Sequence, residues 1–162
     1  MLNGFLLFYL SFMQAVAAEQ NYAPNFSLPV INTKKVLKRY GLEELRLSSF
    51  VGPKADAGVS SVVVIMGDSR TFEKDVQTLK KIYPKAQKKK IEFLLLYSSK
   101  DLNFPGKIEN LSIPFPVMND AFEVVRGRYE YLQPQYCYLI KWDRKIQKDI
   151  CSGISDVEKL IK

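Results

Sequence analysis

Two cysteines, Cys137 and Cys151, are the only thiols in this chain, and histidine is absent. The absence of histidine excludes serine–histidine and cysteine–histidine nucleophile systems, a histidine general base and every metal site that needs an imidazole. No other residue pattern indicates a metal or an organic cofactor, and we expect neither. An even number of cysteines is compatible with one disulfide if the chain is exported to an oxidising compartment.

The two cysteines fall within a predicted β-hairpin. Its strands are residues 136–142 and 145–151, with the turn at Asp143-Arg144. A three-residue turn would make Trp142 the partner of Ile146. Cys137 then lies directly opposite Cys151, and Cα atoms of such partners are about 4.5–5.5 Å apart, which is compatible with a disulfide. A two-residue turn breaks this match, so a structural disulfide, free buried thiols and a redox-active pair all stay open.

A second candidate site lies where a predicted strand meets a predicted helix. The turn between them consists of Asp68, Ser69, Arg70, Thr71 and Phe72. The hydroxyl of Ser69 stays protonated near neutral pH without an adjacent base, and Asp68 is the only local candidate for that base. We therefore interpret Asp68 or Ser69 as the cap of the helix and Phe72 as a core residue. An anion bound at this helix start is a further hypothesis, which Arg70 supports and Asp68 and Glu73 oppose.

The rest of the chain is predicted to alternate strands and helices. Residues 62–66 and 91–97 are continuous apolar runs, typical of strands that are buried on both faces. Apolar residues at helical spacing join them, and Pro84 should end or kink this helix. Two buried strands joined by a helix imply a right-handed parallel crossover. The other predicted elements are an extended segment at 21–32, a half-buried strand at 45–50, a loop at 52–60, a helix at 121–129 and a last helix opened by the capping box Ser155–Glu158.

The first eighteen residues carry no charge and end in small residues. This pattern is typical of a signal peptide with a cleavage site after Ala17 or Ala18. We expect residues 1–18 to be a signal peptide and residues 19–162 to form one domain that is periplasmic or secreted. An uncleaved membrane anchor is the alternative, although the apolar run is a little short for a span. Contact with a membrane is expected only if this segment stays uncleaved.

The net charge of the chain is +7, and much of it lies in two clusters. These are Lys34, Lys35, Lys38 and Arg39, and then Lys80, Lys81, Lys85, Lys88, Lys89 and Lys90. A basic surface can favour nucleic acid or an anionic membrane. No aromatic residues interleave the second cluster as stacking platforms, and an exported protein rarely meets nucleic acid. We interpret the second cluster as a solvated helix face and expect no nucleic-acid partner.

Four phrases in this order resemble the thioredoxin fold, and more narrowly the redoxin group. They are APNFSLP at 23–29, LRLSSFVG at 45–52, IPFPVMNDAFEVVRGRY at 113–129 and CYLIKWDRKI at 137–146. The redoxin group comprises alkyl hydroperoxide reductase/thiol-specific antioxidant proteins and exported thiol–disulfide reductases. The resemblance implies a thioredoxin-like α/β domain, a three-layer sandwich in which helices flank a mixed central sheet.

The chain departs from these families at both halves of their redox site. The resemblance implies a Trp-Cys-x-x-Cys motif before the first helix, but here Ser69 stands for the attacking cysteine and Phe72 for the resolving one. Peroxiredoxins place a threonine and a cysteine in this turn, and Thr71 could correspond to that threonine. The family's cis-proline position falls on Gln135, with Pro134 one residue early.

Loss of both halves predicts a redox-silent protein and argues against an enzyme. We expect an exported domain that keeps the fold and binds a protein or small-molecule partner, whose identity the sequence does not give. The alternative function is that of an atypical antioxidant or thiol oxidoreductase that uses Cys137, Cys151 or both.

Overall fold

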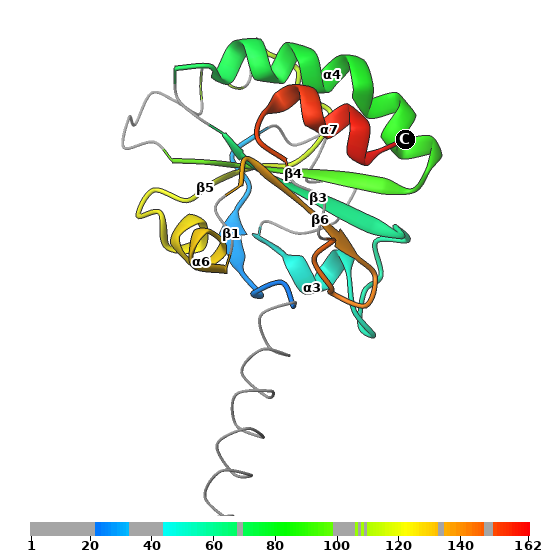
Figure 1. The fold of residues 1–162 in the computed structure, drawn as a ribbon. Helices are drawn as coiled ribbons and strands as arrows, with labels where there is room; N and C mark the ends of the chain where they lie inside the picture. The colour runs from blue at the N-terminus through cyan, green and yellow to red at the C-terminus, as the bar shows by residue number, and fades with distance from the viewer. Residues whose placement is uncertain are drawn as a thin grey trace, which may run out of the picture.

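The computed structural model describes residues 22–32, 44–67, 70–98, 106, 108, 110–132, 135–147 and 151–162. The elements follow the chain as shown in Figure 1. They are β1 (Ser27–Pro29), β2 (Glu44–Arg46), α3 (Leu47–Phe50), β3 (Ser61–Gly67), α4 (Phe72–Lys88), β4 (Ile91–Tyr97), β5 (Val117–Asn119), α6 (Val124–Leu132), β6 (Cys137–Lys141) and α7 (Ile154–Leu160).

A four-stranded mixed sheet in the order β5-β4-β3-β6 forms the centre of the fold. β3 and β4 are parallel and joined by α4, which confirms the predicted crossover, and β5 runs parallel to β4. β6 pairs antiparallel with β3, so that Val63 of β3 lies between Phe93 and Leu139. The continuous apolar runs of β3 and β4 are buried because both faces of the sheet are covered.

Helices cover both faces of the sheet, as a three-layer α/β sandwich requires. Figure 1 shows α4 and α7 side by side on one face, with α3, α6 and the β1–β2 pair on the other. Side chains alternate along each strand, so Val63 and Ile65 pack beneath α4 and α7, whereas Val62 and Val64 pack against α3 and α6. The expected thioredoxin-like architecture is confirmed.

Residues 45–50 were expected to form a half-buried strand, and this expectation was only half correct. β2 ends at Arg46, and residues 47–50 form the short helix α3. The side chain of Asn25 accepts a hydrogen bond from the backbone N–H of Ser48 at 3.2 Å, which satisfies one amide of the first turn. Leu47 and Phe50, three residues apart, are then both buried.

Pro84 was expected to end or kink the first long helix. The helix does not end there, because α4 continues to Lys88. A proline inside a helix lacks the N–H that would bond to the carbonyl four residues earlier. Tyr83 and Ala86 on either side of Pro84 are nonetheless buried, in line with Leu79 on the same stripe. Burial of this stripe outweighs the loss of one helical hydrogen bond.

The strand β5 was missed, and α6 begins later than the helix expected at 121–129. The buried side chain of Asn32 pairs with β5, because its Oδ1 accepts from the N–H of Val117 and its Nδ2 donates to the carbonyl of Phe115. A turn precedes α6, in which Glu123 takes a φ of 57° and its N–H bonds to the carbonyl of Asp120. Apolar periodicity reveals neither the distant polar contacts of Asn32 nor the local turn at Glu123.

The capping box expected at Ser155 does not form. Helix α7 begins at Ile154, so Ser155 lies inside its first turn, and Gly153 is the N-cap without a side-chain hydrogen bond. Asp156 instead accepts the backbone N–H of Ser152 at 3.0 Å. Within the described ranges, no helix is long and apolar enough to cross a membrane.

We predict that Phe93→Ala destabilises the fold by about 3–5 kcal/mol, the usual cost of emptying a fully buried aromatic site. The Phe93 ring is fully buried and packs against Tyr83 and Phe115 at centroid distances of 5.4 and 5.8 Å. Denaturant unfolding measures the loss. Phe122→Ala is the matched control, because Phe122 is 86% exposed and should change the free energy of unfolding by about 0.5 kcal/mol or less. Equal effects of the two variants would contradict the proposed core.

Candidate functional site

The described residues of the turn between β3 and α4 carry side chains with little nucleophilic chemistry. Arg70 and Thr71 are exposed, and Phe72 is 4% exposed. The ring of Phe72 packs edge-on against Tyr97 with the centroids 4.8 Å apart. Phe72 is therefore a core residue, as expected. Asp68 and Ser69 lie outside the described residues.

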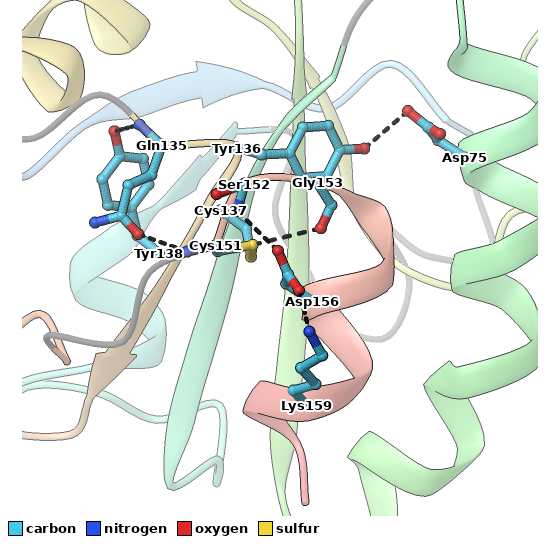
Figure 2. Close-up of a disulfide and its surroundings, with 10 residues drawn as sticks. All are labelled: Asp75, Gln135, Tyr136, Cys137, Tyr138, Cys151, Ser152, Gly153, Asp156 and Lys159. Atoms are coloured by element: carbon cyan, nitrogen blue, oxygen red, sulfur yellow. Dashed lines mark hydrogen bonds and ion pairs between the residues drawn. A yellow bond between two sulfur atoms is a disulfide. The ribbon is translucent and has the colours of Figure 1, made fainter.

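A buried carboxylate connects this turn to β6. Asp75 is 5% exposed, and its Oδ2 accepts hydrogen bonds from the Thr71 hydroxyl and the Tyr136 hydroxyl, both at 2.8 Å. Figure 2 shows Tyr136 reaching across to Asp75 on α4. The cap expected from Asp68 or Ser69 was misplaced, because the N-cap of α4 is Thr71 and its hydroxyl bonds to Asp75 and not to the backbone. The arrangement binds α4 to the start of β6.

The sequence contained a signal for this contact. Asp75 lies three residues after Phe72 and one before Val76, so it falls on the apolar stripe of α4. A charged residue on a buried stripe needs a polar partner, because an unpaired buried carboxylate is costly. Spacing alone does not identify Tyr136 as that partner.

The last residue of β3 is held by α6. The guanidinium of Arg126 donates to the carbonyl of Gly67 at 2.6 Å, and its backbone N–H donates to the carboxylate of Asp120 at 2.8 Å. A Cβ atom at Gly67 would lie 3.1 Å from the carbonyl oxygen of Leu96, so only glycine fits here without displacement. The carboxyl end of β3 is thus closed by backbone and side-chain contacts from its neighbours.

Cys137 and Cys151 form a disulfide with a Cα–Cα distance of 5.3 Å. Neither residue has exposed surface, and both belong to the core cluster beneath α4 and α7. Cys137 is the first residue of β6, and Cys151 lies just before α7 (Figure 2). The disulfide therefore joins the sheet to the segment that leads into the last helix.

The register expected for the hairpin was wrong. The N–H of Lys141 bonds to the carbonyl of Lys145, and Ile140 bridges Ile146, so Trp142 lies in the turn and does not pair with Ile146. This register alone does not place the cysteines opposite each other. The N–H of Tyr136 bonds to the carbonyl of Cys151. The register at Cys151 therefore differs by one residue from the register at Lys141 and Lys145. The predicted second strand is reduced to isolated bridges in the described residues.

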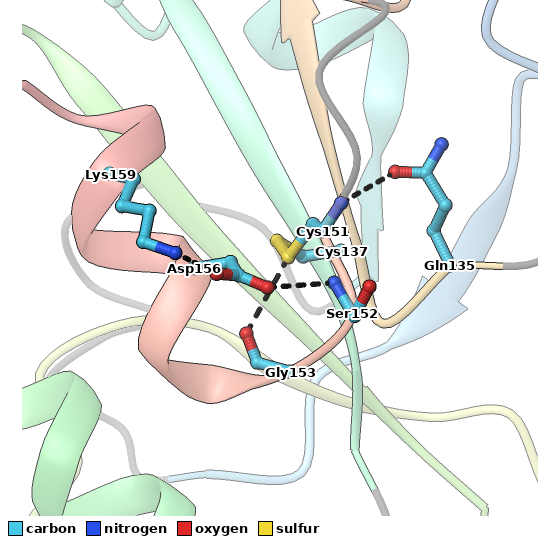
Figure 3. Close-up of polar contacts among 7 residues, drawn as sticks. All are labelled: Gln135, Cys137, Cys151, Ser152, Gly153, Asp156 and Lys159. Carbon is cyan, nitrogen blue, oxygen red and sulfur yellow. Dashed lines mark hydrogen bonds and ion pairs between the residues drawn. A yellow bond between two sulfur atoms is a disulfide. The ribbon is translucent and has the colours of Figure 1, made fainter.

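Polar contacts fix the backbone around Cys151 (Figure 3). Its N–H donates to the side-chain oxygen of Gln135 at 3.0 Å. On the other side, the N–H of Ser152 donates to Asp156, whose other carboxylate oxygen accepts from Lys159 at 2.7 Å. The bonds from Lys159 and then Ser152 lower the pKa of Asp156. Their stabilisation is therefore present above the ordinary pKa of aspartate and is lost as pH falls through the lowered value.

Gln135, which was expected at the cis-proline position of the redoxin resemblance, lies just before β6, and Pro134 lies outside the described residues. The N–H of Gln135 donates to the hydroxyl of Tyr138 at 3.2 Å, and burial raises the pKa of that hydroxyl. The side-chain nitrogen of Gln135 is buried and has no hydrogen-bond partner among the residues that the structure describes. In the described part of the chain, acidic and cysteine side chains nowhere gather in threes as a metal site would require.

Two hollows lie at the opposite end of the sheet, near the start of β3. One, of about 410 Å³, is lined by Asp56–Val59, Gln87 and Lys90–Glu92. The other, of about 490 Å³, lies beside Trp142 and is also lined by Ser60, Ser61, Leu139, Lys141, Asp143 and Gln147. Neither hollow includes a residue of the β3–α4 turn or either cysteine.

Comparison with known proteins identifies the fold. No protein-family model and no curated protein sequence matches the chain. The solved thioredoxin domain of a thiol-disulfide oxidoreductase from Bacteroides vulgatus superposes with a TM-score of 0.60 at 18% identity, over 88% of this chain and 97% of that one. The mitochondrial 2-Cys peroxiredoxin from Plasmodium falciparum gives 0.62 at 15% identity, over 88% and 90%. Peroxidoxin BcpB from Mycobacterium tuberculosis gives 0.62 at 15%, over 87% and 91%. The chain therefore has the thioredoxin-like fold of redoxins, and its cysteine pair is not a Cys-x-x-Cys motif.

We predict that Tyr136→Phe lowers the free energy of unfolding by about 1.5–3 kcal/mol, because it removes one of two donors to a buried carboxylate. Denaturant unfolding monitored by circular dichroism measures the change. Tyr22→Phe is the matched control, since Tyr22 is 47% exposed and its hydroxyl is expected to contribute little. A Tyr136→Phe variant as stable as the control would show that the Asp75 contact does not hold α4 to β6.

We predict that the double variant Cys137→Ala/Cys151→Ala is less stable by roughly 3 kcal/mol, the chain-entropy value for a loop of this size. The two cysteines are 14 residues apart in sequence. Unfolding is measured with and without reductant. The wild type should lose stability with reductant, whereas the double variant should not respond. A wild type that is unaffected by reductant in the unfolding transition, and no more stable than the double variant, would contradict a stabilising disulfide.

Proposed function

We propose that this protein is an exported thioredoxin-fold domain without dithiol chemistry, which serves as a binding or accessory domain for a protein or small-molecule partner. The observation that carries the proposal is the position of its only two cysteines. Both are fully buried and bonded to each other, and neither lies in the β3–α4 turn.

Thiol–disulfide exchange requires a thiolate that can reach the sulfur of its substrate. In a thioredoxin-type site, the start of the helix after the first buried strand lowers the pKa of the attacking cysteine. Here the described part of that turn offers an exposed arginine, an exposed threonine and a buried phenyl ring. Phe72, at the position of the resolving cysteine, is committed to the core by its contact with Tyr97.

The space on the sheet side of this turn is also occupied. Thr71, Asp75 and Tyr136 form a closed set of hydrogen bonds between α4 and β6. A carboxylate that accepts from two hydroxyls does not act as a redox group, and no histidine is available in the sequence to make either hydroxyl a nucleophile. These contacts support a structural role for the residues that replace the redox site.

Two observations support export. Residues 1–18 are uncharged and end in small residues, as a signal peptide does. A disulfide between the only cysteines fits an oxidising compartment, since cytosolic thiols are kept reduced. We therefore propose a periplasmic or secreted location for residues 19–162.

A thiol oxidoreductase that works through the buried disulfide is the second candidate. One observation favours it: Tyr136 bonds through its backbone to Cys151 and through its hydroxyl to Asp75, so the disulfide neighbours the β3–α4 turn. In this candidate, the segment before α7 would have to open to expose a sulfur.

We predict that the purified protein reduces neither insulin disulfides nor hydrogen peroxide above the background rate. Turnover is measured for the wild type and for Cys137→Ser, with a thioredoxin carrying an intact Cys-x-x-Cys motif as the positive control. The two proteins should be equally inactive. Wild-type turnover that disappears in Cys137→Ser would overturn the redox-silent proposal and establish the second candidate.

A further inference from the structure

An exposed cluster of aromatic and basic side chains lies where the described chain begins. Tyr22 and Trp142 are 47% and 52% exposed, and Lys54, Lys141 and Lys145 are exposed beside them. We call these five residues the Tyr22–Trp142 face. Two of the four large apolar side chains that are exposed in the described part of the chain belong to it.

Backbone contacts bring the members of this face together. Tyr22 forms an antiparallel bridge with Lys145, three residues after Trp142. The N–H of Ala23 bonds to the carbonyl of Arg144 at 2.9 Å, and the Arg144 guanidinium donates back to the Ala23 carbonyl at 3.0 Å. The N–H of Gly52, two residues before Lys54, bonds to the carbonyl of Trp142 at 2.7 Å. The face is thus held in place by the fold.

The face lies at the end of the domain away from α4 and α7. In Figure 1 the blue start of the described chain and the orange turn after β6 lie together at this end. The hollow of about 490 Å³ adjoins Trp142, and its lining includes the Lys141 side chain and Ser61. The hollow therefore adjoins the Tyr22–Trp142 face.

We propose that the Tyr22–Trp142 face rests on the surface of an anionic lipid bilayer. Tryptophan and tyrosine favour the boundary between headgroups and acyl chains, because their rings are apolar and carry one polar atom. Lysines beside them attract anionic headgroups. This inference goes beyond the proposed function, applies to the form of the protein that keeps residues 1–18, and is independent of whether the disulfide is redox-active.

The sequence before Tyr22 is the reason for choosing a bilayer as the occupant. The uncharged apolar segment ends at Ala18, four peptide steps before Tyr22. Four extended steps span at most about 14 Å. When residues 1–18 are retained in a bilayer, Tyr22 must therefore lie close to its surface, and the fold places Trp142 and the lysines at the same end.

The charges of the Tyr22–Trp142 face suit contact with an anionic bilayer. Lys145 is paired with Asp143 at 3.1 Å, which partly neutralises it. Lys54 and Lys141 form no ion pair within the described residues. They are the lysines available to anionic lipid, and each should favour the docked state by about fivefold at a typical anionic surface.

The test uses Trp142 as its own reporter, since it is the only tryptophan in the chain. The full-length protein is reconstituted into vesicles of phosphatidylcholine alone or mixed with phosphatidylglycerol. Docking is expected to move the tryptophan emission to shorter wavelength in the anionic vesicles, to protect it from an aqueous quencher and to expose it to brominated lipids. High salt should reverse much of the change, because headgroup attraction by exposed lysines is screened.

Two matched variants locate the contact. Lys54→Gln/Lys141→Gln should shift the ratio of docked to undocked protein by about 25-fold toward undocked, at about fivefold per lysine. Lys81→Gln/Lys88→Gln removes the same charge from the exposed side of α4 and should leave the ratio unchanged.

An emission that is the same in both vesicle types and open to the aqueous quencher would overturn the inference. So would a larger loss in the α4 variant, which would assign the contact to that helix. Either result leaves the insulin and peroxide assays, and the proposed function, unaffected.

Discussion

The hydrogen bonds of Tyr136 organise the end of the domain where β3 leads into α4. Its hydroxyl reaches Asp75 in α4, its N–H reaches the carbonyl of Cys151, and its own carbonyl accepts from Met66 in β3. One residue thus joins the central strand, the first long helix and the disulfide. These bonds link three elements of the fold at the carboxyl end of β3.

Secondary structure could be predicted from the sequence alone where the apolar residues followed one clear pattern. The uninterrupted apolar runs of β3 and β4 predicted the buried crossover, and the bounds of β4 agree with those predicted. Prediction failed where a distant polar group decided the structure. Asn32 pairs with β5 across more than eighty residues, and Asn25 helps turn the expected second half of a strand into α3. The period of apolar residues carries no information about such partners.

The candidate site likewise contains features that the sequence predicted and features that it did not. Phe72 was predicted as core from its place on the apolar stripe, and it is buried. The partner of Asp75 depends on how β6 is positioned after folding, which local spacing does not specify. The hairpin register was wrong because the turn closes at Lys141 and Lys145 and the pairing then shifts before Cys151. A strictly regular ladder was the false assumption in that prediction.

The disulfide also closes a covalent ring around the turn that carries Trp142. Cys137 and Cys151 enclose the whole stretch between β6 and the approach to α7, including the exposed Lys141 and Lys145. A protease that cuts after either lysine would therefore not divide the protein in two. The nicked chain would keep α7 tethered to the sheet, and its fragments would part only after reduction. In a compartment rich in proteases, the bond thus keeps the molecule in one piece after a cut at the exposed turn that carries Trp142.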